Sequence, residues 1–183
     1  MIKTEIEHLR RLLGDMTTLT QVESGGLEMQ LQPVEPANLL EYIRRTYEPL
    51  AAQKGITLTV ETKPNLPTIN IDEGRMVQVL KNLVDNALRY TPPGGTIHIS
   101  AEMSDKVHLR VTDSGNGIDP EDLPYVFDRF YRADKNRGGN AGKMGLGLAI
   151  CKALVEAQGG TIEVTSGGSE AGTTFSIKLP PTI

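Results

Sequence analysis

Apolar residues recur at intervals of three and four between positions 72 and 90, and this spacing predicts an amphipathic helix. Asp72 suits the N-cap position, and Pro92 marks the end. We expect the helix to pack on a core through its apolar face. That face consists of Met76, Val79, Leu80, Leu83, Val84 and Ala87.

The same helix carries a polar stripe on another face. Asn82, Asn86 and Arg89 follow at i, i+4 and i+7, which stacks their side chains on one side, and Tyr90 borders them. Asparagine is a mediocre helix former because its amide competes for nearby backbone groups. A pair of asparagines in mid-helix therefore indicates either a ligand site or a solvated face.

Hydrophobic patterns elsewhere predict further strands and helices. The expected elements are a strand over 27–32, a helix over 36–54, strands over 56–60 and 69–71, a hairpin of 96–103 with 106–112, a helix over 146–157, and a hairpin of 161–165 with 173–179. Because the helices and the mostly antiparallel strands segregate, we expect an α/β (α+β) two-layer sandwich. Its mixed, mostly antiparallel sheet would carry three main helices on one face.

Residues 1–24 form a separate unit ahead of a main domain over 28–181. An apolar seam at alternating spacings of four and three predicts a helix packed in a coiled coil or bundle, and Gly25 and Gly26 end it. An amphipathic helix lying on the main domain is the alternative. The seam residues are Ile2, Ile6, Leu9, Leu13 and Met16.

Composition and charge narrow the functional classes. With 38% hydrophobic and 23% charged residues the chain reads as globular, and its net charge of −4 argues against non-specific nucleic-acid binding. Cys151 lies in an apolar helical run, which is typical of a small buried hydrophobe. His98 and His108 take outward strand positions and are expected to be ordinary exposed residues. Because the sequence has no apolar run of membrane-spanning length and no signal peptide, we expect a soluble, cytoplasmic chain without membrane contact.

A carboxylate and two glycines follow the strand that ends near residue 112. Gly115 and Gly117 would let backbone approach a flat ligand closely, and Asp113 could accept a hydrogen bond from an exocyclic amine. A tight surface turn is the alternative interpretation.

Two further segments indicate an anion site. Glycines at 142, 145 and 147 lead into the helix over 146–157, and a helix N-terminus offers unpaired N–H groups to phosphate oxygens. The run 129–143 is basic, with Arg129 and Arg132 suited to bidentate phosphate contact. A glycine hinge and a solvated basic loop are the alternatives. Three aromatic residues are expected to anchor this run on the core: Phe127, Phe130 and Tyr131.

The order of these segments resembles the N, G1, F, G2 and G3 boxes of sensor histidine kinases. The resemblance covers residues 28–181 and runs from the asparagine pair through D-S-G-N-G, F-D-R-F-Y-R and G-L-G-L to G-T-T-F. It implies the Bergerat-type ATP-binding fold, which is shared with type II topoisomerases, the MutL family and heat-shock chaperone ATPases.

The resemblance also implies roles for individual residues. Asp113 would bind the adenine amino group of ATP, Asn86 would hold Mg²⁺ against the phosphates, and Asn82 would sit near the γ-phosphate or the metal. The residues lining the adenine pocket would be Gly115, Gly117 and Ile118. The remaining ATP-binding positions, most of them phosphate contacts, would be Arg89, Tyr90, Arg132, Gly142, Lys143, Gly145, Leu146, Gly147, Leu148 and Thr173.

The N-terminal helix resembles the end of the second helix of the family's dimerisation and phosphoacceptor domain. His8 lacks the acid that follows the family's phosphoacceptor and the proline five residues on, since Leu9 and Leu13 stand there. We therefore expect the phosphoacceptor to lie outside this chain. The implied partners are a histidine-bearing dimerisation domain and a response regulator. The parent protein is expected to be a homodimer, with any membrane anchor in segments not present here.

The residue type at position 82 distinguishes between the possible reactions. Related hydrolases carry glutamate at the position of Asn82, and asparagine cannot act as a general base. The resemblance therefore implies transfer of the γ-phosphoryl group to histidine, with Mg²⁺ and Arg132 neutralising charge. A hydrolysing ATPase and a non-catalytic binding module are the alternatives. Lys143 and Met144 depart from the glycine and small hydroxyl residue usual in the second glycine box, which leaves the role of Lys143 open.

Overall fold

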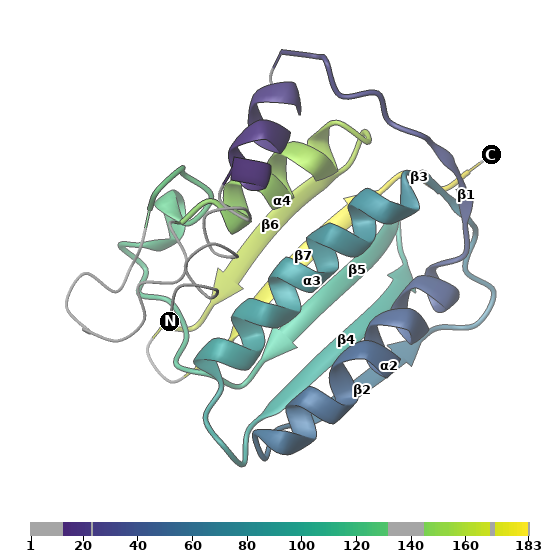
Figure 1. Ribbon diagram of the computed structural model, residues 1–183. Helices are drawn as coiled ribbons and strands as arrows, with labels where there is room; N and C mark the ends of the chain where they lie inside the picture. Colours follow the sequence, from purple (N-terminus) through teal and green to yellow (C-terminus); the bar gives the residue numbers. More distant parts are fainter. Residues whose placement is uncertain (1–12, 23, 132–144, 169–170, 183) are drawn as a thin grey trace.

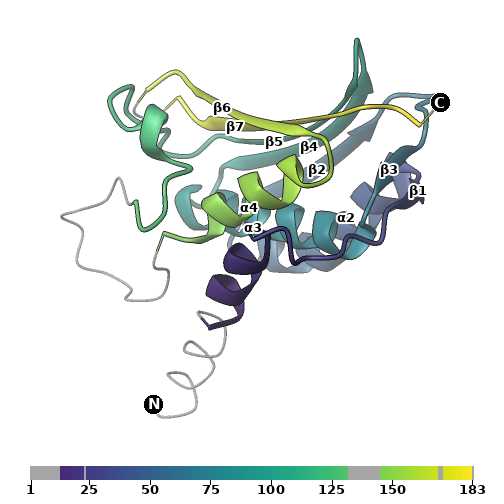
Figure 2. The same cartoon turned by 90° about the horizontal axis from the view of Figure 1, so that it is seen from above.

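The computed structural model describes residues 13–22, 24–131, 145–168 and 171–182. Its main body has two layers, and helices α2, α3 and α4 lie together on one face of a twisted sheet (Figures 1 and 2). The helices are α2 (Pro36–Gln53), α3 (Glu73–Tyr90), α4 (Gly147–Glu156) and the short 3₁₀ helix η1 (Leu123–Tyr125). The strands are β1 (Gln32–Val34), β2 (Thr57–Thr62), β3 (Ile69–Ile71), β4 (Thr96–Met103), β5 (Val107–Asp113), β6 (Thr161–Ser166) and β7 (Thr173–Leu179).

The main sheet has the strand order β2-β4-β5-β7-β6. Only the β2–β4 pair is parallel, and the other three pairs in this sheet are antiparallel. The predicted mixed, mostly antiparallel two-layer sandwich is thereby confirmed. A small second sheet, in which β1 pairs antiparallel with β3, was not foreseen.

The core lies between the sheet and the three helices. Ile97 and Ile99 of β4 alternate inward, as does Leu109 of β5, and all three are fully buried. They meet the apolar face of α3, where Met76 and Leu80 are also fully buried. Each such side chain contributes about 1.5–3 kcal/mol relative to leaving it exposed. The sheet and the apolar stripe of α3 therefore fix where the polar stripe points.

Helix α3 begins as the sequence predicts. The Asp72 carboxylate accepts the backbone N–H of Arg75 at 3.0 Å, which satisfies one of the free donors of the first turn. The Asp72 backbone N–H in turn donates to the side chain of Gln158 at 2.8 Å. The start of α3 is thus tied to the segment that follows α4.

The predicted strand over 27–32 is wrong. Residues 27–31 have no regular secondary structure, and β1 begins at Gln32, which pairs with Ile71 at the end of β3. The next residue, Asp72, turns away to cap α3, so an earlier strand would have no partner. Its other carboxylate oxygen instead accepts the N–H of Gln30 at 3.1 Å.

His108 is buried, contrary to expectation. It does lie on the outward face of β5, but only 8% of its surface is exposed. The hairpin turn covers it, with Ser104 Oγ at 3.2 Å and Asp105 Oδ1 at 3.3 Å from Nε2. Arg110 lies on its other side, with Nη2 at 3.4 Å from Nδ1.

Residues 13–22 form a helix beside α4. Leu19 is 6% exposed and belongs to the core, and Val22 packs against it. Leu13 and Met16 are 64% and 48% exposed, so the described part of the seam points outward. The helix therefore lies on the main domain through Leu19 and Val22, which are not seam residues, while the described seam positions stay exposed. The remaining seam residues lie outside the described residues: Ile2, Ile6 and Leu9. Among the described residues, no helix is both long and apolar enough to cross a membrane.

Candidate functional site

Asp113 is the acid of the predicted site, and it is deeply buried. It ends β5 between Ile97 of β4 and Thr173 of β7, and 7% of its surface is exposed. Its Oδ1 accepts the N–H of Gly115 at 2.9 Å, and the backbone of Thr173 also donates to the carboxyl group. Burial raises the pKa of Asp113 above its ordinary value, although these two hydrogen bonds oppose the shift. A carboxylate has about four acceptor positions, so capacity for a ligand amine remains.

The loop after β5 packs closely on the end of α3. A Cβ on Gly115 would lie 2.5 Å from the carbonyl oxygen of Tyr90, and the N–H of Asn116 donates to that oxygen at 3.2 Å. Gly117 has φ +71°, and a Cβ there would come within 2.0 Å of the Gly168 carbonyl oxygen. The two glycines therefore allow this loop to approach other backbone segments closely. The sequence instead predicts that they allow close approach to a ligand.

The same loop is attached to the turn between β6 and β7. Ser166 Oγ accepts the N–H of Ile118 at 2.9 Å and donates to the Gly172 carbonyl at 2.7 Å. The Gly172 N–H donates to Gly115 at 3.1 Å. Sequence reasoning missed Ser166, because a serine before two glycines at a strand end reads as ordinary turn chemistry.

The polar stripe of α3 faces the start of α4. Asn82 Nδ2 donates to the Gly147 carbonyl at 3.4 Å, so the middle of α3 adjoins the first turn of α4. Leu146 occupies the N-cap position of α4 and has no side-chain acceptor, so side-chain capping does not satisfy the first N–H groups of α4. The half-buried Asn86 amide makes no side-chain hydrogen bond to another described residue. Asn82 thus adjoins the α4 N-terminus, and Asn86 follows one turn further along the same face of α3.

One helix face joins the two parts of the site. Tyr90 is 40% exposed, and the Arg89 guanidinium lies over its ring at 5.6 Å. Asn82 and Tyr90 are eight residues apart, which corresponds to about 12 Å along a helix. The buried carboxylate and its loop lie at one end of this span, and the α4 N-terminus lies at the other. A ligand with a flat base and a chain of phosphates has the matching shape.

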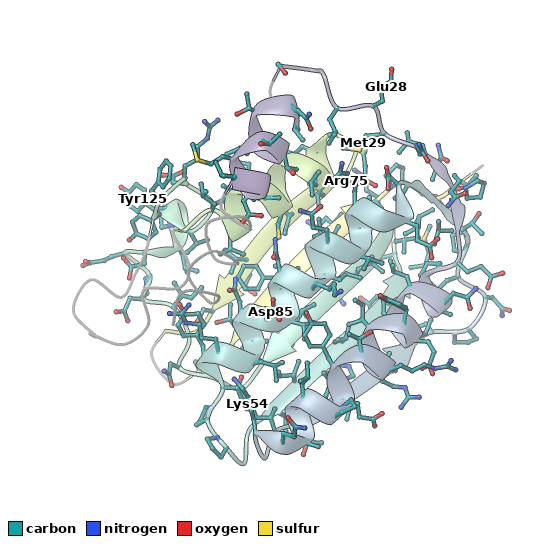
Figure 3. All side chains as sticks on the ribbon, viewed as in Figure 1. Glu28, Met29, Lys54, Arg75, Asp85 and Tyr125 are labelled. Carbon is teal, nitrogen blue, oxygen red and sulfur yellow. The ribbon has the colours of Figure 1, made fainter. Side chains whose placement is uncertain are left out.

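Asp85 separates the two asparagines in sequence but points elsewhere. It projects toward α2, where Tyr47 OH donates to its Oδ1 at 2.9 Å (Figure 3). Burial, followed by the charge of Asp85, raises the pKa of Tyr47 above its ordinary value. The carboxylate nearest in sequence to Asn82 and Asn86 therefore helps to join two helices.

The basic run is only partly described. Arg132, Gly142 and Lys143 lie outside the described residues. The N–H of Phe130, near its start, donates to the carbonyl of Gly145, just beyond its end, at 3.1 Å. These two residues have positive φ values of 63° and 71°.

The expected aromatic anchors differ from one another. Phe127 packs edge-on against Phe175 with ring centroids 6.3 Å apart, as an anchor would. Tyr131 donates a hydrogen bond to Asp122, whereas Phe130 is 56% exposed and is not an anchor. The backbone bond to Gly145 explains the difference, because it holds Phe130 in a left-handed conformation with its ring outward.

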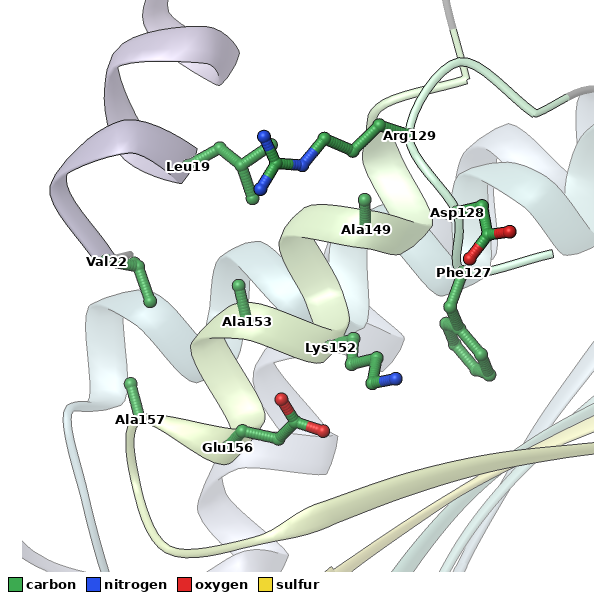
Figure 4. Close-up of a pocket in the computed structure, with 10 residues that line it drawn as sticks. All are labelled: Leu19, Val22, Phe127, Asp128, Arg129, Ala149, Lys152, Ala153, Glu156 and Ala157. Carbon is green, nitrogen blue, oxygen red and sulfur yellow. The ribbon is translucent and has the colours of Figure 1, made fainter. Parts of the chain in front are cut away.

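A separate groove of about 480 Å³ runs between residues 13–22 and α4 (Figure 4). Leu19 and Val22 line one side, opposite Ala149 and Ala153 of α4. None of the predicted ATP-binding residues that the structure describes lines it. The groove therefore marks the junction between the N-terminal helix and the main domain.

Comparison with known proteins identifies the architecture around this site. Residues 71–183 match the model of the family described as histidine kinase-, DNA gyrase B- and HSP90-like ATPases. The sensor protein SrrB of Staphylococcus aureus (strain MRSA252) is 39% identical to the chain over 184 residues. That alignment covers 98% of the chain and 31% of SrrB, so the chain spans about a third of the length of the curated relatives it matches.

Solved structures agree with the sequence comparisons. Full-length ShkA in complex with AMPPNP superposes with a TM-score of 0.84 at 31% identity, covering 96% of the chain and 36% of ShkA. The histidine kinase ThkA in complex with the response regulator TrrA gives a TM-score of 0.73 at 26% identity, covering 97% of the chain and 49% of the ThkA chain. The isolated catalytic domain of ThkA gives 0.72 at 29% identity and covers 84% of the chain and 97% of that domain.

Proposed function

This chain belongs to the family of histidine kinase-, DNA gyrase B- and HSP90-like ATPases, and we propose that it is the ATP-binding catalytic domain of a sensor histidine kinase. It transfers the γ-phosphoryl group of ATP to a histidine on a dimerisation domain, for relay to a response regulator. The similarity to a sensor protein and to a kinase solved with its response regulator supports this proposal.

The adenine end of ATP fits the pocket at the end of β5. The buried Asp113 carboxylate accepts a hydrogen bond from the exocyclic amine of adenine. Two backbone N–H groups hold the carboxylate in place and leave acceptor positions for the amine. The backbone from Gly115 to Ile118 lines the pocket beside it. A base that presents a carbonyl oxygen at this point meets a second acceptor and is rejected.

The phosphate end fits the junction of α3 with α4. The N–H groups of Gly147 and Leu148 face the phosphates from the first turn of α4, where the helix dipole favours negative charge. Arg89, Tyr90 and Thr173 are further described residues of the ATP site. Arg132, Gly142, Lys143 and the peptide from Gly145 to Leu146 are assigned to the phosphates on sequence resemblance.

Asn86 and Asn82 suit a magnesium ion shared with the phosphates. Hard cations prefer oxygen ligands, and Mg²⁺ in nucleotide sites takes few ligands from the protein. The half-buried Asn86 amide has no competing side-chain hydrogen bond among the described residues, so its oxygen is available. When bound, the ion neutralises phosphate charge. Asn86 and Asn82 hold and orient it.

The main support for the proposed reaction is the asparagine at position 82, Asn82. Its amide contacts the start of α4, where a hydrolase needs a general base, and asparagine cannot accept a proton. Asp85 is the adjacent acid, and its hydrogen bond to Tyr47 directs it toward α2. Water next to the γ-phosphate is therefore not activated by these residues, which preserves ATP for an incoming histidine.

The domain assignment extends this proposal to the N-terminus. Residues 1–24 are the end of the second helix of a dimerisation domain, and residues 28–181 are the catalytic domain. The outward position of Leu13 and Met16 supports this, because a bundle partner needs an exposed apolar seam. The parent protein is a homodimer through that bundle.

Two measurements on the purified chain test the proposal. Calorimetric titration is expected to show ATP binding that strengthens with Mg²⁺ and exceeds GTP binding. Phosphate release is expected to stay near the uncatalysed background over many turnover times. Steady release at an ATPase rate would contradict a transferase, and absence of any ATP binding would favour a non-catalytic module.

A further inference from the structure

Ser166 connects the base-binding loop to the sheet through a single hydroxyl group. It is the last residue of β6, and its side chain is half-buried. Its oxygen accepts the Ile118 N–H at 2.9 Å while its proton goes to the Gly172 carbonyl at 2.7 Å. One atom therefore bridges the end of the loop over 115–118 and the residue that precedes β7.

The backbone segments around this bridge are closely packed. Gly117 lies so close to Gly168 that a Cβ would come within 2.0 Å of its carbonyl oxygen. A Cβ on Gly172 would come within 2.1 Å of the Asp113 carbonyl oxygen. The loop, the turn after β6 and the end of β5 thus meet at backbone contact distance, and the Ser166 side chain joins the first two.

Only a side chain that both donates and accepts can make this bridge. Alanine would leave the Ile118 N–H and the Gly172 carbonyl without their side-chain partner. Threonine keeps the hydroxyl, and its β-branched side chain suits a strand. The two substitutions therefore separate loss of the hydrogen bonds from a change of volume.

We propose that Ser166 is a positioning residue for base recognition, which holds the backbone of 115–118 at a fixed distance from the Asp113 carboxylate. The proposal rests on the proposed nucleotide site. Ser166 itself does not touch the base. It acts through Ile118, at one end of the pocket wall, and through Gly172, whose N–H is bonded to Gly115 at the other end.

The test measures nucleotide selectivity in Ser166→Ala and Ser166→Thr. In Ser166→Ala, ATP affinity is expected to fall about tenfold, whereas GTP affinity, which gains nothing from Asp113, changes less than about twofold. Ser166→Thr is expected to keep ATP affinity within about twofold of wild type. Ser100→Ala is the matched control, because Ser100 is a half-buried strand serine without a side-chain hydrogen bond to other described residues.

Unchanged ATP affinity in Ser166→Ala overturns the proposal, as does an equal loss for ATP and GTP, which would indicate general damage to the site. Amide hydrogen exchange without nucleotide gives a second reading. The Ile118 amide is expected to exchange about tenfold faster in Ser166→Ala and at the wild-type rate in Ser166→Thr. If wild type binds no ATP, the nucleotide site fails and the base-recognition role fails with it, while exchange still decides whether the attachment exists.

Discussion

Asp113 combines deep burial with a negative charge, a costly arrangement that a protein keeps only with compensation. The described compensation is two backbone N–H groups, and burial still raises the pKa of the carboxyl group. The nearby glycines could be read from the sequence as a sign of close approach. Their actual neighbours, Tyr90 and Gly168, could not, because those contacts join segments far apart in the chain. The same holds for the Ser166 bridge.

Replacing the Asp113 carboxylate is expected to weaken ATP binding. Asp113→Asn leaves one oxygen where two backbone donors and the adenine amine compete, so affinity should fall about 10- to 100-fold, measured by calorimetry. Glu121→Gln removes the same charge from an exposed position nearby and should change affinity by less than about twofold. Equal effects of the two variants would show that charge alone matters.

The raised pKa of Asp113 also predicts a pH dependence of stability. The folded pKa lies above the unfolded one, so the ionised group costs stability at pH values above the folded pKa. That cost disappears as the pH falls below the unfolded pKa. The difference in Tm, Asp113→Asn minus wild type, should therefore be larger at about pH 7 than at about pH 4. Thermal scans across this range would refute the assignment if the difference were constant or grew toward acid.

Asn86 should matter only when the metal is present. Asn86→Ala is expected to weaken ATP binding at least about tenfold in Mg²⁺ and less than about twofold in chelator, because it removes an oxygen ligand for the ion. Titrations of the same variant in the two buffers provide the internal control. Equal losses in both would place Asn86 on the nucleotide rather than on the metal.

At the level of elements, periodicity predicts what packing then confirms. Helix α3 and β3 follow the sequence closely, because strong patterns and a recognised N-cap coincide. The predicted strand over 27–32 shows the limit of such patterns. Alternation defines a strand only if a neighbour is available, and β3 ends where Asp72 caps α3. The burial of His108 likewise depends on how the hairpin turn folds over it.

Asp72 is expected to stabilise the whole domain through its two carboxylate oxygens. Asp72→Ala removes the α3 cap and the bond to Gln30, and should lower the free energy of unfolding by about 1–2 kcal/mol. Asp72→Asn keeps one oxygen for the Arg75 N–H but loses the bond to Gln30, so its loss should be smaller. Urea unfolding would measure both. Equal losses would mean that the cap contributes nothing beyond the bond to Gln30.

At the level of the whole molecule, a helix over residues 13–22 lies against the domain that resembles known ATPases. Leu19 and Val22 place that helix beside α4, whose first turn adjoins the proposed phosphate site. Similar solved structures include full-length ShkA and the isolated catalytic domain of ThkA. The fold class and the order of the site segments could be predicted from sequence. The junction could not, because the apolar pattern of the helix supports two partners.

The proposed reaction transfers phosphate to histidine rather than to water. The most direct measurement incubates this chain with γ-labelled ATP, Mg²⁺ and a separate histidine-bearing dimerisation domain, and follows both protein-bound label and free phosphate. His8→Gln in the chain excludes labelling of its own N-terminal histidine. We predict acid-labile, base-stable label on the added domain and free phosphate near background. Free phosphate that accumulates steadily while the added domain stays unlabelled would contradict the assignment as a histidine kinase.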